Sequence, residues 1–106
     1  MANNYKNAKV DLTSADATTV LTTSAGSTNV IKSILVAEDS GNADTIDLTI
    51  VAGSDTFNLF KVKAVGANTT VELLTQPLVL QDSEILKAEA ATANRLHLVV
   101  SYLEIS

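Results

Sequence analysis

The chain of 106 residues has seven basic and twelve acidic side chains, a formal net charge of -5, and no cysteine. This length suits one compact domain with one core. The basic residues are spread singly, so no basic stripe exists to neutralise phosphates, and nucleic-acid binding is disfavoured. Without cysteine, disulfides, thiolate metal sites and cysteine nucleophiles are excluded.

The sequence shows no targeting or membrane segment. The first residues, Met1 to Lys6, lack the basic and apolar regions of a signal peptide. The longest apolar runs, such as Ile34 to Ala37, have four residues, far short of a membrane span. We therefore expect a soluble protein that contacts no membrane and has no conventional export signal.

Alternation of apolar and polar residues predicts strands along the whole chain. The cleanest alternation is Thr45 to Ala52, where Ile46, Leu48 and Ile50 are expected to face inward. The expected strands cover residues 3–13, 18–23, 29–38, 45–52, 57–65, 69–74, 78–80, 85–91 and 95–106, separated by turns rich in Gly, Asn, Asp and Ser. Residues 84–94 also contain good helix formers, but the regular spacing of turns favours a strand there.

These patterns predict an all-β fold, a single antiparallel β-sandwich over residues 1–106. It is expected to be jelly-roll-like, with eight or nine short strands. Residues 3–13 are expected at a sheet edge, and residues 1–7 are a candidate for an extended arm.

Two expected strands change the face on which their apolar residues lie. In residues 95–106, Leu96, Leu98 and Val100 share one face, but Leu103 and Ile105 fall on the other. Either a bulge redirects this strand or its second half is covered on both sides. In residues 57–65 the apolar set changes from Phe57 and Leu59 to Phe60, Val62 and Ala64, which also predicts a bulge.

No motif for catalysis, cofactor binding or metal binding emerges, so we expect no enzyme. His97 is the only histidine, and no Asp or Glu stands near it at a supporting spacing. It is therefore interpreted as a surface or interface side chain rather than a general base. Glu38, Asp39, Asp44 and Asp47 surround a turn that could offer oxygen ligands to Ca²⁺, but acidic residues also favour turns for their own hydrogen bonding.

Several apolar residues lie on strand faces that should contact solvent. A single sandwich has one interior, so extra apolar faces favour burial against copies of the chain or another protein, although some could lie under loops. The predicted interface residues are Ile31, Leu35, Leu74, Val99, Leu103 and Ile105.

Three segments resemble small β-sandwich structural proteins from the virions of tailed bacteriophages. Residues 20–37 look like their "L-Y-T-x-P-x-G … V-x-S-I-x-V-x-N" segment, and residues 78–86 are similar to their "P-L-x-L-x-x-G-D-x-L" turn. Residues 100–106 resemble their C-terminal strand. The sequence departs from this pattern at Thr22, where an aromatic is usual, at Ser24, where Pro is usual, and at Asp82-Ser83, in place of Gly-Asp.

The resemblance implies a non-enzymatic virion component without a cofactor, made in the host cytoplasm. Its expected partners are the major capsid protein or other virion proteins, and copies of itself. Capsid decoration (cement) is the first hypothesis, and a tail, baseplate or fibre-adaptor component is the second. A carbohydrate-binding module is a third, disfavoured because sugar platforms use exposed aromatic rings and this chain has two Phe, two Tyr and no Trp.

Overall fold

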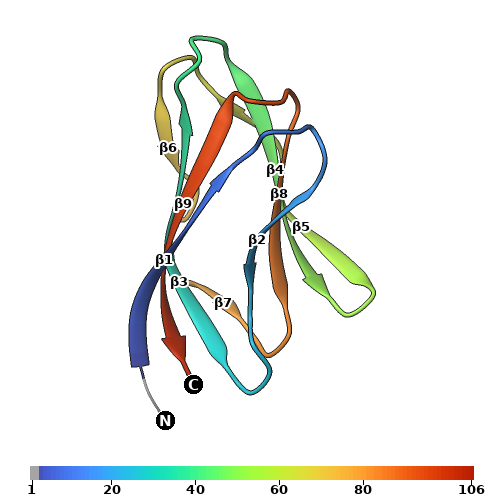
Figure 1. The fold of residues 1–106 in the computed structure, drawn as a ribbon, viewed down its shortest axis with the longest axis vertical. Coiled ribbons are helices and arrows are strands. Elements are labelled where there is room, and N and C mark those ends of the chain that lie inside the picture. The colour runs from blue at the N-terminus through green and yellow to red at the C-terminus, as the bar shows by residue number, and fades with distance from the viewer. Residues whose placement is uncertain (1–2) are drawn as a thin grey trace.

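The computed structural model describes residues 3–106, which form nine strands in two antiparallel sheets (Figure 1). The strands are β1 (Asn3–Asp11), β2 (Thr18–Thr22), β3 (Thr28–Glu38), β4 (Asp44–Ala52), β5 (Asp55–Val65), β6 (Thr70–Glu72), β7 (Leu78–Leu80), β8 (Ile85–Ala90) and β9 (Leu96–Ile105). Within this range no residue is helical, so the described residues contain no helix that could cross a membrane.

The antiparallel strand pairs follow one another like the rungs of a single long hairpin, which folds over to form both sheets. β1 pairs with β9, β2 with β8, β3 with both β6 and β7, and β4 with β5. Additional pairing of β3 with β9 and of β4 with β8 joins these pairs into two sheets. We call them the β9 sheet (order β1-β9-β3-β6, with β7 also on β3) and the β8 sheet (order β2-β8-β4-β5).

The predicted all-β sandwich is confirmed, with nine strands in two antiparallel sheets over the described residues. Residues 85–90 form a strand rather than a helix, as predicted, and Leu86, Ala88 and Ala90 are buried. β1 is a sheet edge, and β9 lies between β1 and β3.

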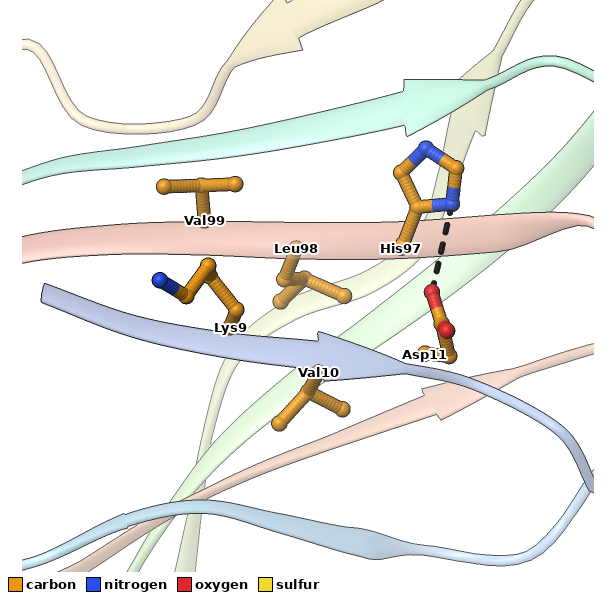
Figure 2. A pocket seen from close by; sticks show the side chains of 6 residues that line it. All are labelled: Lys9, Val10, Asp11, His97, Leu98 and Val99. Carbon is orange, nitrogen blue, oxygen red and sulfur yellow. Dashed lines mark ion pairs between the residues drawn. The ribbon is translucent and has the colours of Figure 1, made fainter.

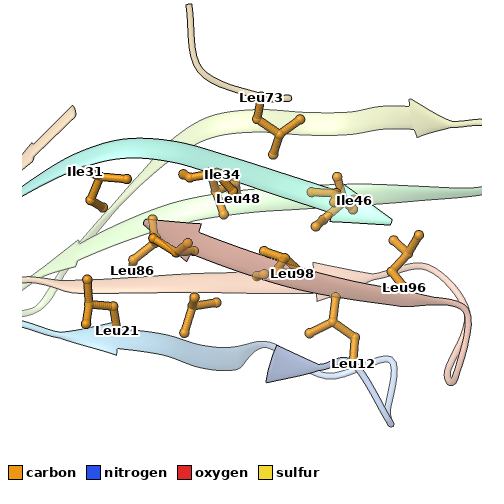
Figure 3. Packing of buried hydrophobic residues seen from close by; sticks show 14 of the residues in the cluster. Leu12, Leu21, Ile31, Ile34, Ile46, Leu48, Leu73, Leu86, Leu96 and Leu98 are labelled. Atoms are coloured by element: carbon orange, nitrogen blue, oxygen red, sulfur yellow. The ribbon is translucent and has the colours of Figure 1, made fainter. Parts of the chain in front are cut away.

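The core lies between the sheets and is almost entirely aliphatic. Ile34 and Leu98 of the β9 sheet face Leu48 and Leu86 of the β8 sheet (Figure 3), and all four are at most 1% exposed. Burying a side chain of this size stabilises a fold by about 1.5–3 kcal/mol. Of the aromatic residues only Tyr102 is buried, so the core depends on close packing of branched side chains.

Of the two alternatives for residues 95–106, the bulge is wrong. The β1–β9 register runs without a shift from Asn3↔Ile105 to Asp11↔His97, and Tyr102 continues the buried face of Leu98 and Val100. The irregularity is in the neighbouring strand, where the β3–β9 register shifts between Ile31 and Ser33. Leu103 is therefore on the outer face of a regular strand, and is half-buried.

The bulge in β3 also changes the predicted face of Ile31. Lys32 is the extra residue, so Ile31 and Ile34 both reach the core, whereas simple alternation would place them on opposite faces. Ile31 is 0% exposed, and its prediction as an outer-face residue is wrong.

The predicted irregularity in residues 57–65 is confirmed, but the apolar residues that it buries are not the ones that the alternation pattern indicated. The β4–β5 register shifts twice, between Ile46 and Leu48 and again between Leu48 and Thr49. Because of these shifts Val65 is buried, whereas Val62 is 62% exposed and Ala64 is exposed. The apolar residues Val62 and Ala64 therefore lie outside the core.

The candidate arm is only partly described. Residues 3–7 are part of β1 and pair with β9, while residues 1 and 2 lie outside the described residues. The ends of β1 and β9 run side by side at one end of the sandwich (Figure 1).

Candidate interaction surface

The outer face of the β9 sheet has an apolar row across its full width. Tyr5 of β1 pairs with Leu103 of β9, Leu103 pairs with Val30 of β3, and Val30 pairs with Val79 of β7. Directly paired residues of antiparallel strands point to the same face. The ends of the row are the most open, with Tyr5 79% and Val79 49% exposed.

A second, shorter apolar row lies further along the same face. Val99 of β9 pairs with Leu35 of β3, and both side chains are more than a third exposed. Lys9 of β1 and Glu72 of β6 stand at the two ends of this row. We call the residues of both rows, together with the half-buried Ile105, the apolar outer face: Tyr5, Val30, Leu35, Val79, Val99, Leu103 and Ile105.

Polar groups divide and border the apolar outer face. Between the rows, Ser101 pairs with Ser33, next to the exposed bulge residue Lys32. The carboxylate of Glu72 accepts hydrogen bonds from the Ser33 hydroxyl and, at 2.7 Å, from the Ile34 N–H. Glu72 thereby provides an acceptor for the N–H of Ile34, which lies between the part of β3 that pairs with β6 and the part that pairs with β7.

The outer face of the opposite sheet is polar at its centre, although β5 at its edge exposes Phe57 and Val62. On the outer face of the β8 sheet, Asp47 pairs with Glu89 and Thr49 pairs with Lys87. Only Val51 and Ile85 add an apolar pair there. The two outer faces therefore differ in kind, and the apolar one belongs to the β9 sheet.

The structure brings four of the six predicted interface residues onto one surface: Leu35, Val99, Leu103 and Ile105. Ile31 is in the core, as described above. Leu74 is half-buried and packs against the core, in a groove that Leu59, Phe60 and Pro77 also line. Whether any of them contacts a partner stays a prediction.

Three residues of the apolar outer face were missed by sequence reasoning. Tyr5 is missed because its pairing with Leu103 joins two strands from opposite ends of the sequence. Val30 is missed because the bulge at Lys32, which places it on the outer face, does not show in the alternation pattern. Val79 is in a strand of three residues, too short for an alternation pattern to be decisive.

His97 has two carboxylate neighbours that the sequence did not indicate. Its Nδ1 lies 3.4 Å from Oδ1 of Asp11 (Figure 2), and its Nε2 lies 3.7 Å from Oδ2 of Asp39. The two carboxylates are more than 70% exposed, and ion pairs in such surroundings contribute little. A shallow pocket beside His97 is lined by Lys9 and Val99 (Figure 2), so the histidine borders the apolar outer face.

The acidic residues around the turn after β3 do not converge. Glu38 is 2% exposed, and its carboxylate accepts hydrogen bonds from the hydroxyl and N–H of Ser40 and from the N–H groups of Gly41 and Asn68. These bonds, chiefly the one from the Ser40 hydroxyl, lower the pKa of Glu38 to about 2.

The other acidic residues of this turn have separate partners. Asp44 accepts from the N–H of Thr92 and Asp47 from the N–H of Val62. Across residues 3–106, no three His, Asp or Glu side chains are arranged to hold a metal ion.

The exposed aromatic rings do not form a platform. Tyr5 is on β1 of the β9 sheet, and Phe57, 56% exposed, is on β5 of the β8 sheet. Carbohydrate-binding surfaces need rings that lie together. This separation gives the carbohydrate-binding hypothesis no support.

Comparison with known proteins found similarity to solved structures. No protein-family model matches the chain, and no curated protein matches it. Among solved structures it is similar to a pentameric capsid protein isolated from metagenomic phage sequences, with 19% sequence identity and a TM-score of 0.48. The match covers 94% of this chain but 60% of that protein, so this chain spans less than two thirds of its length. No residue role is carried over from it.

Proposed function

We propose that this chain is a structural virion protein of a tailed bacteriophage, and specifically a capsid decoration or cement protein without enzymatic activity. The observation that carries the proposal is the apolar outer face of the β9 sheet. Exposed apolar side chains on one continuous sheet surface favour a protein partner. The resemblance of residues 20–37, 78–86 and 100–106 to phage virion proteins suggests which partner that is.

In this function the β9 sheet lies flat against the shell. Tyr5, Leu103 and Val79 contribute apolar area, which stabilises an interface by about 25 cal/mol per Å² removed from water. The polar β8 sheet remains in solvent. Each contact is modest, and firm attachment comes from many copies that each bridge neighbouring capsid subunits.

Particles of the phage that encodes this chain provide the test. The band of this protein on a denaturing gel is compared in intensity with the band of the major capsid protein. Hundreds of copies per particle are expected. A handful of copies would overturn decoration in favour of a tail, baseplate or fibre-adaptor role, and absence from particles would overturn both.

A further inference from the structure

The four sheet edges of the sandwich differ in how well they are protected. Among the described strands, β2 has a register shift between Thr19 and Leu21, β5 has two shifts, and β6 and β7 have three residues each. Bulges and short lengths are features that stop an edge from pairing with another chain. β1 has neither, because its nine residues pair with β9 in one unbroken register.

The first half of β1 is open to solvent and contains a single charged residue. Every residue from Asn3 to Asn7 is exposed. Lys6 is the only charged residue among them, and its Nζ lies 2.9 Å from Oε1 of Glu104 in β9. The contact with Glu104 raises the pKa of Lys6, mainly through the hydrogen bond and then through the attraction between the two charges. A lysine on an edge normally repels a second strand, but this one is paired within its own sheet.

We propose that the free edge of β1 pairs antiparallel with β1 of a second copy, with Tyr5 opposite Tyr5 of the partner. In this register Asn3 lies opposite Asn7 of the other copy and Asn4 opposite Lys6, so no like charges meet. A register centred on Lys6 would place two lysines directly opposite each other, which is unfavourable. The Tyr5 register instead gives an aromatic cross-strand pair, which is favourable.

The absence of like-charge pairs in the Tyr5 register and the apolar row both favour a second copy of the chain as the partner of the β1 edge. Because the two-fold contact is self-complementary, the row Tyr5–Leu103–Val30–Val79 meets its own copy at Tyr5. One continuous row then crosses both β9 sheets. The dimer does not depend on the proposed function, but it would present a doubled apolar outer face to neighbouring shell subunits.

Single-cysteine variants test the register, because the chain has no cysteine of its own. With Tyr5→Cys the two sulfur atoms can reach each other, since disulfides need Cα atoms within about 7 Å. With Asn7→Cys the two Cα atoms would be about 14 Å apart along the strands. After oxidation with glutathione, a disulfide-linked dimer is expected from Tyr5→Cys and not from Asn7→Cys. The reverse result would overturn the proposal.

A matched pair of charge variants tests the edge contact in solution. Asn3→Lys with Asn7→Lys places two like-charged pairs across the contact, whereas Asn3→Glu with Asn7→Lys places two opposite-charged pairs. From cross-strand pair energies, the first dimer should dissociate about tenfold more readily than the second. Sedimentation equilibrium measures this, and thermal melting checks that both variants fold.

Two other results would overturn the edge dimer. One is a wild-type chain that stays monomeric at high micromolar concentration. The other is a dimer that both charge variants leave unchanged but Leu103→Asp abolishes, which would indicate a face contact. Failure of the proposed function is separate: a dimer with no affinity for particles contradicts decoration alone, and a monomer that binds particles contradicts dimerisation alone.

Discussion

Lys32 is a single extra residue that decides which side chains of β3 reach the core. Because of it, Ile31 is buried and Val30 joins the apolar outer face. Sequence alternation could not show this, since residues 30 and 31 are both β-branched and either one suits a core. By contrast, Ile46, Leu48 and Leu96 were placed correctly because polar residues flank them on the opposite face.

Leu98 provides the test of the core at the residue scale. It is 1% exposed between the two sheets. Truncating such a leucine to alanine costs about 2–5 kcal/mol, and Leu98→Asp also buries an unpaired carboxylate. Since domains are stable by about 5–15 kcal/mol in total, we expect Leu98→Asp to abolish folding. A soluble variant with a cooperative thermal transition would contradict this.

Val62 has a backbone conformation that β-branched residues rarely adopt. Its φ is +54°, within the irregular part of β5, and its N–H donates a 2.6 Å hydrogen bond to Oδ1 of Asp47. The left-handed region costs a side chain of this kind about 1–2 kcal/mol, which glycine avoids. Val62 is also 62% exposed, so little packing is lost on truncation.

Val62→Gly should therefore raise the free energy of unfolding by about 0.5–1 kcal/mol, after glycine's own entropic cost is subtracted. Urea unfolding measures the change. Val79→Gly is the matched control, because Val79 is exposed in a strand without positive φ, and it should destabilise. Equal destabilisation by both substitutions would show that the backbone of Val62 is not strained.

At the scale of elements, Glu38 connects two loops that are distant in sequence. Its carboxylate binds Ser40 and Gly41 after β3 and Asn68 between β5 and β6. The sequence places Glu38 at an acidic turn, but cannot show that the carboxylate is turned inward toward a loop thirty residues away. Long-range hydrogen bonding of this kind follows from strand order, which alternation patterns do not encode.

The lowered pKa of Glu38 predicts a specific acid sensitivity. Its pKa is about 2 in the folded protein against an ordinary value of 4.5. The unfolded chain therefore binds the proton first, so the stabilisation is complete above pH 4.5 and is lost as the pH falls toward 2. Glu38→Gln should be less stable than wild type at neutral pH and lose less stability across this range.

Urea unfolding at a series of pH values measures this difference. Asp55→Asn is the control, because Asp55 is an exposed carboxylate at the start of β5, next to the turn of the β4–β5 hairpin. It should leave the pH dependence close to that of wild type. If Glu38→Gln and wild type lost stability in parallel between pH 4.5 and 2, the linkage to Glu38 would be wrong.

At the scale of the whole molecule, we expect substitution by aspartate to weaken binding to capsid particles on one outer face and not on the other. Leu103 is half-buried at the centre of the apolar outer face, so Leu103→Asp should fold and lose at least tenfold in affinity for capsid particles, as is typical of central interface residues. Thr49→Asp on the β8 sheet should fold and bind normally. Co-sedimentation with particles lacking the protein measures both.

Equal binding by these two variants would place the contact elsewhere on the molecule. Leu103 also shows the reach of sequence reasoning at this scale. The sequence indicated that it faces away from the core, because Leu98 and Val100 fix the parity of its strand. Which other residues share its surface depends on the order β1-β9-β3, and no local pattern contains that order.

The central position of β9 also limits when the molecule can fold. β9 is synthesised after the other eight strands, yet it lies between β1 and β3. Until residues 96–105 have left the ribosome, β1 lacks its partner strand and β3 can pair only with β6 and β7, so the β9 sheet stays incomplete. Pairing across such sequence separations is slow, on the order of milliseconds to seconds. Each new copy therefore passes through a period in which its β1 edge and its core leucines are exposed together, and aggregation competes with folding most strongly then.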